Sequence, residues 1–128
     1  MTPRWPTLDA GMKWGAAIGI IPDQKGGTWM MFRSEPPIVH FDAAGKITTK
    51  FAEGKFVQAH GFCQDAAGNF WAGDSGPFTD IPGAAGKGFQ LFKFSPKGDV
   101  LLTLGKAGVS KAGEDTFIGP TSCVVLPN

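Results

Sequence analysis

Residues 61–71, GFCQDAAGNFW, are a second copy of residues 19–29, GIIPDQKGGTW. Gly, Asp, Gly and Trp fall in register 42 residues apart in the two copies. A second block follows each copy, IVHFDAAGKITTKF at residues 38–51 and LFKFSPKGDVLLTL at residues 91–104. A third copy begins at residue 120 and reads PTSCVVLPN. Repeats of this size are stacking units, and about three or more are usually needed to bury their faces.

Each copy is predicted to form two β-hairpins. The Asp-then-Gly turns PDQKGG and QDAAGN, and the turns DAAG and SPKG, are typical of tight hairpins with a glycine at positive φ. The predicted strand pairs are residues 16–21 with 28–32, 38–42 with 46–51, 61–63 with 70–73, and 90–94 with 99–104. No segment carries a sustained helical spacing of apolar residues.

Four antiparallel strands that recur every ~40–50 residues are typical of a β-propeller blade. The sequence therefore predicts an all-β chain of two blades plus the first strand of a third. Residues 1–13 are a lead-in, 14–59 are blade one, 60–119 are blade two with long loops, and 120–128 are the first strand of the next blade. A two-layer sandwich fits less well, because it does not require matching positions at a constant interval.

Composition excludes several classes of function. The net charge is +1 and lysines are spread along the chain, so nucleic acid is not an expected partner. No apolar run approaches the ~20 residues of a membrane helix, so no membrane is expected either. The N-terminus MTPRWPTLDAGMK has no hydrophobic core of a signal peptide, but a mature secreted chain would look the same. The compartment therefore stays open.

Two cysteines, Cys63 and Cys123, each lie in the first strand of a repeat. The first interpretation is a pair of buried free thiols, which behave as small hydrophobes. A disulfide is the alternative, although two cysteines in 128 residues are not a disulfide scaffold. A cysteine metal site is not expected, because there is no CxxC motif.

Hairpin geometry predicts that four polar residues share one rim. His60 is expected just before a first strand, while Arg33, Asp74 and Ser75 end second strands, and these two places lie at the same end of a hairpin. Neutral imidazole is the commonest metal ligand, but one histidine is not a zinc site. For Arg33 the alternatives are a salt bridge to Glu35 and the clamping of a substrate carboxylate.

Other conspicuous residues receive structural interpretations. The segment AGDSGPF around Ser75 resembles the serine of chymotrypsin-like proteases, but the order and spacing of the residues exclude that triad. Asp74 is instead expected to accept turn or inter-blade hydrogen bonds, and Asp23 and Asp65 to form turns. His40 is expected on the surface.

The loop at residues 75–88, SGPFTDIPGAAGKG, is a Gly/Pro-rich insertion that leaves from the same rim. Its apolar residues Phe78 and Ile81 are either a contact surface or anchors that pin the loop. Insertions in repeat proteins tend to fall on one face, often the binding face.

Taken in order, FVQAHGFCQDAAGNFWAGDSG, FQLFKFSPKGDVLLTLGKAGV and DTFIGPTSCVVLPN resemble the NHL-repeat propellers. Within them the chain is most similar to the catalytic core of peptidyl-α-hydroxyglycine α-amidating lyase and its bacterial relatives. The resemblance runs from about Trp14 to Asn128. It implies a six-bladed propeller, and members of this family are often secreted or periplasmic. The family cleaves peptidyl-α-hydroxyglycine to a peptide amide and glyoxylate, with zinc held by three histidines.

The resemblance carries four residues over to this chain. It implies that His60, in AHG, is a zinc ligand and that Arg33, in MMFRSE, belongs to the substrate site. The carbonyls of Ile20 and Phe62 match positions that help hold a structural calcium. The other two zinc histidines and the catalytic tyrosine belong to later blades, and this chain contains no tyrosine. One ligand of three is then present.

Three functions follow as hypotheses. The first is a propeller fragment or self-associating unit, not catalytically complete as a monomer, in which three copies would give six blades. The second is a metal-dependent lyase completed by further blades or by a trimer that brings three His60 side chains to one axis. A peptide substrate is expected only in that case. The third is a protein-binding propeller scaffold.

Overall fold

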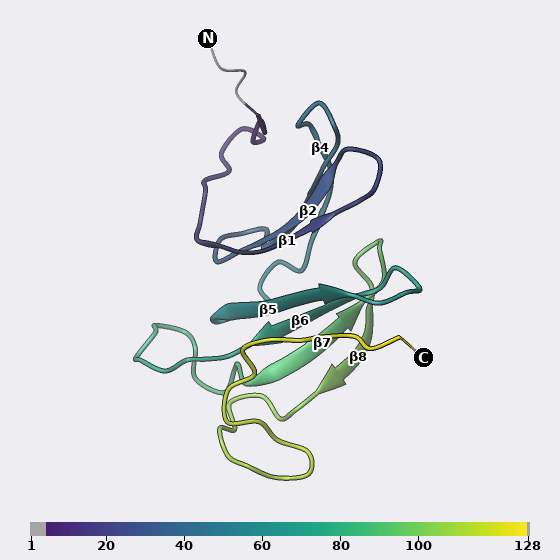
Figure 1. Ribbon diagram of the computed structural model, residues 1–128. Coiled ribbons are helices and arrows are strands. Elements are labelled where there is room, and N and C mark those ends of the chain that lie inside the picture. The colour runs from purple at the N-terminus through teal and green to yellow at the C-terminus, as the bar shows by residue number, and fades with distance from the viewer. Residues whose placement is uncertain (1–4, 128) are drawn as a thin grey trace.

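The computed structural model describes residues 5–127, and over that range it is all-β, without a helix. The strands are β1 (Ala17–Pro22), β2 (Thr28–Phe32), β3 (Ile38–Phe41), β4 (Ile47–Phe51), β5 (Ala59–Gln64), β6 (Phe70–Asp74), β7 (Gln90–Phe94) and β8 (Val100–Leu104). They form two four-stranded antiparallel sheets, ordered β1-β2-β3-β4 and β5-β6-β7-β8 (Figure 1). The predicted all-β class is confirmed, and each strand lies where a hairpin was predicted.

The Asp-x-x-Gly turns that join β1 to β2 and β5 to β6 are held by the same hydrogen bonds in both sheets. Asp23 Oδ1 accepts the backbone N–H groups of Lys25 at 2.7 Å and Gly27 at 2.8 Å. Asp65 Oδ1 accepts those of Ala67 at 3.1 Å and Asn69 at 2.9 Å. A carboxylate that accepts the backbone N–H groups of the second and fourth residues after it stabilises the turn, because it satisfies N–H groups within the turn itself. Both aspartates are therefore turn formers, as predicted.

The two sheets stack face to face, and their contact is the main core. Trp29 of β2 lies against Phe70 of β6, with ring centroids 4.5 Å apart. Phe51 of β4 lies against Phe94 of β7 at 5.5 Å. Strands β1 and β5 run against each other at one edge of this contact. The buried members of this core are Met31, Ile38, Phe51, Ala52, Ala59, Phe70, Ala72, Phe92 and Phe94.

The N-terminal segment covers the outer face of the first sheet. Trp14 packs on Phe32 with centroids 5.3 Å apart, and Trp5 packs on Phe41 at 6.3 Å. The lead-in expected at residues 1–13 is thus a cap, although residues 1–4 lie outside the described residues. Repeat proteins commonly close a terminal face in this way, because an uncovered repeat exposes its core side.

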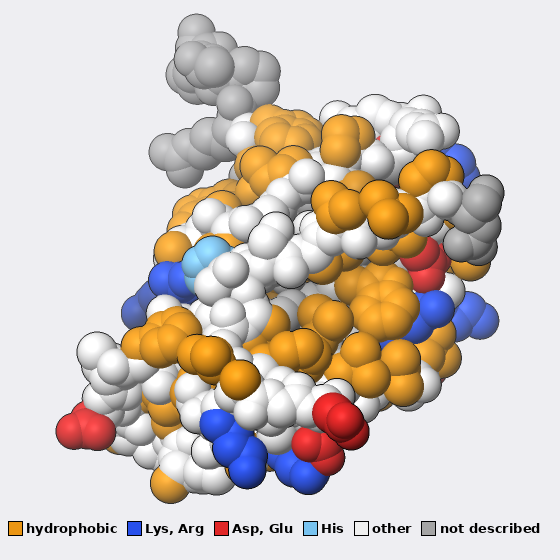
Figure 2. Space-filling model, turned by 60° about the horizontal axis from the view of Figure 1, so that its bottom comes forward, with side chains coloured by type: hydrophobic (Ala, Val, Ile, Leu, Met, Phe, Trp, Pro, Cys, Tyr) orange, Lys and Arg blue, Asp and Glu red, His pale blue; other side chains and the backbone are white. Residues whose placement is uncertain are grey.

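The segment at residues 120–127 crosses the outer face of the second sheet beside β5. A side chain at Gly61 would meet the Ser122 backbone at 2.9 Å, so glycine is required for this close approach. The segment expected to start a third unit is not a strand here, because none of residues 120–127 is paired in a ladder, and Asn128 lies outside the described residues. Apolar side chains gather on this face (Figure 2).

Candidate functional site

Arg33 joins the two sheets at the predicted rim. Its Nε donates a hydrogen bond to the Ala59 carbonyl at 2.9 Å, and its backbone N–H binds Ala16. The structure therefore brings the guanidinium to the residue that precedes His60. Among residues 5–127 no ion pair joins Arg33 to Glu35, so that expectation is wrong. The Glu35 carboxylate instead accepts the backbone N–H of Gly54 at 3.2 Å.

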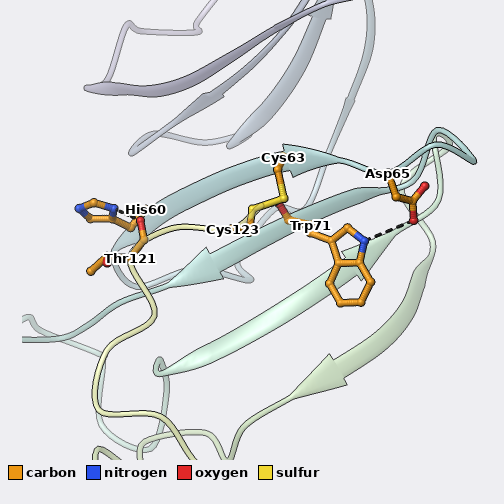
Figure 3. The surroundings of a disulfide bond; sticks show 6 residues. All are labelled: His60, Cys63, Asp65, Trp71, Thr121 and Cys123. Carbon is orange, nitrogen blue, oxygen red and sulfur yellow. Dashed lines mark hydrogen bonds between the residues drawn. A yellow bond between two sulfur atoms is a disulfide. The ribbon is translucent and has the colours of Figure 1, made fainter. Parts of the chain in front are cut away.

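His60 lies inside β5, not just before it as predicted, because the strand already begins at Ala59. Its Nδ1 is 2.6 Å from the carbonyl oxygen of Thr121. A carbonyl only accepts, so Nδ1 carries a proton, and in the neutral ring Nε2 is then the nitrogen with the lone pair. The imidazole points away from the disulfide in Figure 3. A backbone carbonyl that holds one ring nitrogen in this way is also what commonly fixes the orientation of metal-binding histidines.

A disulfide links Cys63 in β5 to Cys123, with the Cα atoms 6.0 Å apart (Figure 3). The interpretation of two free thiols is therefore wrong, and the disulfide alternative holds. Pairing was open from the sequence because the two cysteines are 60 residues apart. The bridge fixes residues 120–127 on β5, two residues from the carbonyl that binds His60.

Asp74 and Ser75 have structural roles on the inside of the rim. Both are fully buried, with 0% exposure. The Asp74 carboxylate accepts the backbone N–H groups of Val57 at 2.7 Å and Gln58 at 2.8 Å, in the segment that links the sheets. Burial raises the pKa of Asp74 although these N–H groups oppose the shift. The predicted hydrogen-bonding role of Asp74 is confirmed.

A polar cluster at the turn end of the second sheet was missed by the sequence argument. Lys93 Nζ lies 3.2 Å from Asp65 Oδ2 and 5.0 Å from the centre of the Trp71 ring, and Trp71 Nε1 donates to the same carboxylate at 3.3 Å. Desolvation alone would raise the pKa of Asp65. The Asn69 N–H, Lys93 and Trp71 outweigh it and lower that pKa to about 2.

The first sheet repeats this cluster with histidine in place of lysine. His40 pairs with Trp29 across the ladder as Lys93 pairs with Trp71, and His40 Nε2 lies 2.8 Å from Asp23 Oδ2. The expectation of a surface His40 is wrong, since its side chain is only 15% exposed. The sequence pattern that could have indicated this cluster is an Asp and a Trp six residues apart, followed in both copies by a basic residue at the matching position of the third strand.

Within the described chain, no group of three or more His, Cys, Asp and Glu side chains is placed to hold a metal ion. A catalytic zinc needs about three protein ligands, and His60 offers one. The strands that carry Ile20 and Phe62 are neighbours, but two carbonyls are far short of the six to eight oxygens of calcium. The donors described here therefore fit neither metal by themselves.

The inserted loop is partly exposed. Phe78 is 58% and Ile81 is 37% exposed, while Phe78 also touches Phe89 edge-on at 6.1 Å. Phe89 and Ala84 are the buried anchors of this loop. The sequence could not separate anchor from contact surface, because all four residues are small or apolar.

In comparisons with known proteins, no family model matches the chain. No curated protein matches it significantly either. Over residues 5–127 there is also no helix with the length and hydrophobicity needed to cross a membrane.

Proposed function

We propose that the chain is a partial NHL-type β-propeller of the amidating-lyase-like kind, with two blades and the lead segment of a third. A side chain at Gly19 would meet Phe62 at 2.7 Å, and a side chain at Gly61 would meet Ser122 at 2.9 Å. The same glycine of each repeat thus lies against the following segment of chain. The proposal rests on this repeated contact between one unit and the first segment of the next, because successive blades of a propeller pack in this way around the ring.

The rim supports the second part of the proposal, that the chain contributes an incomplete site. His60 presents Nε2 outward while Nδ1–H is held by Thr121, and Arg33 is anchored next to it through Ala59. In a site completed by further blades or copies, His60 would be one of several metal ligands, and the guanidinium would bind a negatively charged group of a peptide substrate. A disulfide suits the oxidising compartments in which such relatives often occur.

The test is zinc content and glyoxylate release from a peptidyl-α-hydroxyglycine. We expect the monomer to hold much less than one zinc per chain and to release no glyoxylate, because two ligands are lacking. His60→Ala should remove whatever zinc is retained, and His40→Ala should not. Stoichiometric zinc with glyoxylate release by the monomer would overturn the incompleteness of the site and favour the lyase alternative.

Self-association is the second candidate, motivated by the apolar outer face of the second sheet, where Leu102 is 42% and Leu104 is 38% exposed. Three copies would supply six sheets and three His60 side chains. Ring closure would have to displace the cap at residues 5–14 and residues 120–127, because each covers part of a face that the next copy needs. Native mass spectrometry tests it, and a folded monomer at micromolar concentration argues against it.

A further inference from the structure

The outer face of the second sheet, here called the end face, carries Trp71, Leu91, Lys93, Leu102 and Leu104. The register places these residues on one side, because Trp71 and Leu102 both pair with Lys93 and Leu91 pairs with Leu104. The opposite side carries Phe70 and Phe94, which pack on the first sheet.

The end face is matched by a buried face in the first sheet. Phe51 occupies the ladder position of Leu104, and Ile38 that of Leu91. Ile38 is 0% and Phe51 is 6% exposed, because the second sheet covers them, whereas Leu104 is 38% exposed. The same repeat position is therefore covered in one sheet and open in the other.

The segment at residues 120–127 covers only the edge of the end face. It lies on Gly61 as β5 lies on Gly19, so it takes the place of a first strand. Over the rest of its length a groove of about 750 Å³ separates it from Trp71 and Leu91. On the first sheet the corresponding space is filled by β6, whose Phe70 lies 4.5 Å from Trp29.

The wall of this groove has unpaired backbone and apolar side chains. Within the described chain, no backbone–backbone hydrogen bond joins residues 122–127 to another segment. Val124 is 80% and Leu126 is 75% exposed, and the disulfide at Cys63 holds the segment in place. An extended backbone with open N–H and C=O groups is a template for an added strand.

We propose that the groove accepts one extended strand of a partner protein, antiparallel to residues 120–127, with an aromatic side chain seated on Trp71. The proposal rests on the proposed function in taking the two sheets as successive repeats. Main-chain hydrogen bonds would give affinity and the Trp71–Leu91 floor would give specificity, as in strand addition generally. A complete sheet of a second copy does not fit, because residues 120–127 already fill the place of its first strand.

The chain provides its own probe, because β6 fills the equivalent space on the first sheet. A labelled peptide with the sequence of residues 68–74, GNFWAGD, is titrated with the intact protein by fluorescence anisotropy. We expect saturable binding that weakens at least about tenfold when the residue equivalent to Phe70 is serine, since the aromatic contact is then lost.

Two matched variants place the peptide in the groove. Leu91→Glu puts a charge on its floor and should weaken binding at least about tenfold, whereas Leu101→Glu, at a residue that does not line the groove, should leave it within about twofold. Circular dichroism checks that both variants fold. Reduction by a dithiol, which frees residues 120–127, should also lower the affinity.

Absence of binding at about 1 mM peptide, or equal binding by Leu91→Glu, overturns the inference. If the zinc-content and glyoxylate-release measurements agree with the proposed function while the peptide does not bind, only the groove assignment is wrong. Binding that survives in both glutamate variants would place the peptide elsewhere and would equally overturn the groove assignment.

Discussion

The Nδ1 atom of His60 lies 2.6 Å from the carbonyl oxygen of Thr121, so the segment at residues 120–127 decides which imidazole nitrogen carries the proton. The same segment is tied to β5 by the bridge between Cys63 and Cys123. The disulfide and the candidate metal ligand are therefore mechanically connected, although no atom of the bridge touches the imidazole in a hydrogen bond.

Opening the disulfide should change the tautomer of His60. In Cys63→Ser/Cys123→Ser the Thr121 carbonyl is no longer held, so the Nδ1–H form loses its stabilising acceptor and the two tautomers should mix. Nitrogen-15 shifts of the ring report this directly. His40 is an internal control, because Asp23 and Thr48 bind its ring at 2.8 and 2.5 Å. Unchanged His60 shifts would contradict the connection.

The same double variant should be less stable. Loss of a bridge between residues 60 apart raises the entropy of the unfolded chain, which in the chain-entropy account lowers the free energy of unfolding by about 4 kcal/mol. Urea denaturation measures the change. Because residues 120–127 have few other attachments, the two sheets should keep their circular dichroism spectrum in the absence of urea. A loss of that spectrum would show that the segment supports the sheets.

The sequence predicted the strands well and the tertiary partners poorly. Gly, Asp, Gly and Trp at matched positions determine turns and strands through contacts within a few residues, as Asp65 and its turn illustrate. His40 was misplaced because its burial depends on Trp29 across the ladder and Asp23 at the turn. The bridge from Cys63 and the carbonyl on His60 both come from residues about 60 positions away, which no local pattern encodes.

The Asp65 cluster should make stability depend on acid pH. Its pKa in the folded protein is about 2, below the ordinary value of 3.8, so the folded state favours the carboxylate. The stabilisation is complete above the ordinary pKa and is lost as the pH falls through about 2. Asp65→Asn should therefore be less stable than the unmodified protein at pH 6, and this difference should shrink toward pH 2. A constant difference in urea midpoints across this range would exclude the linkage.

Asp74→Asn should be strongly destabilising, whereas Asp42→Asn should be nearly neutral. Asp74 uses both carboxylate oxygens, Oδ2 for Val57 and Oδ1 for Gln58, so an amide must turn its NH₂ group toward a backbone N–H. Asp42 binds Ala44 and Lys46 through Oδ1 alone, which asparagine retains. A buried N–H that loses its acceptor costs about 1–3 kcal/mol, so thermal unfolding should separate the two variants. Equal melting temperatures would mean that the Asp74 hydrogen bonds do not hold the link between the sheets.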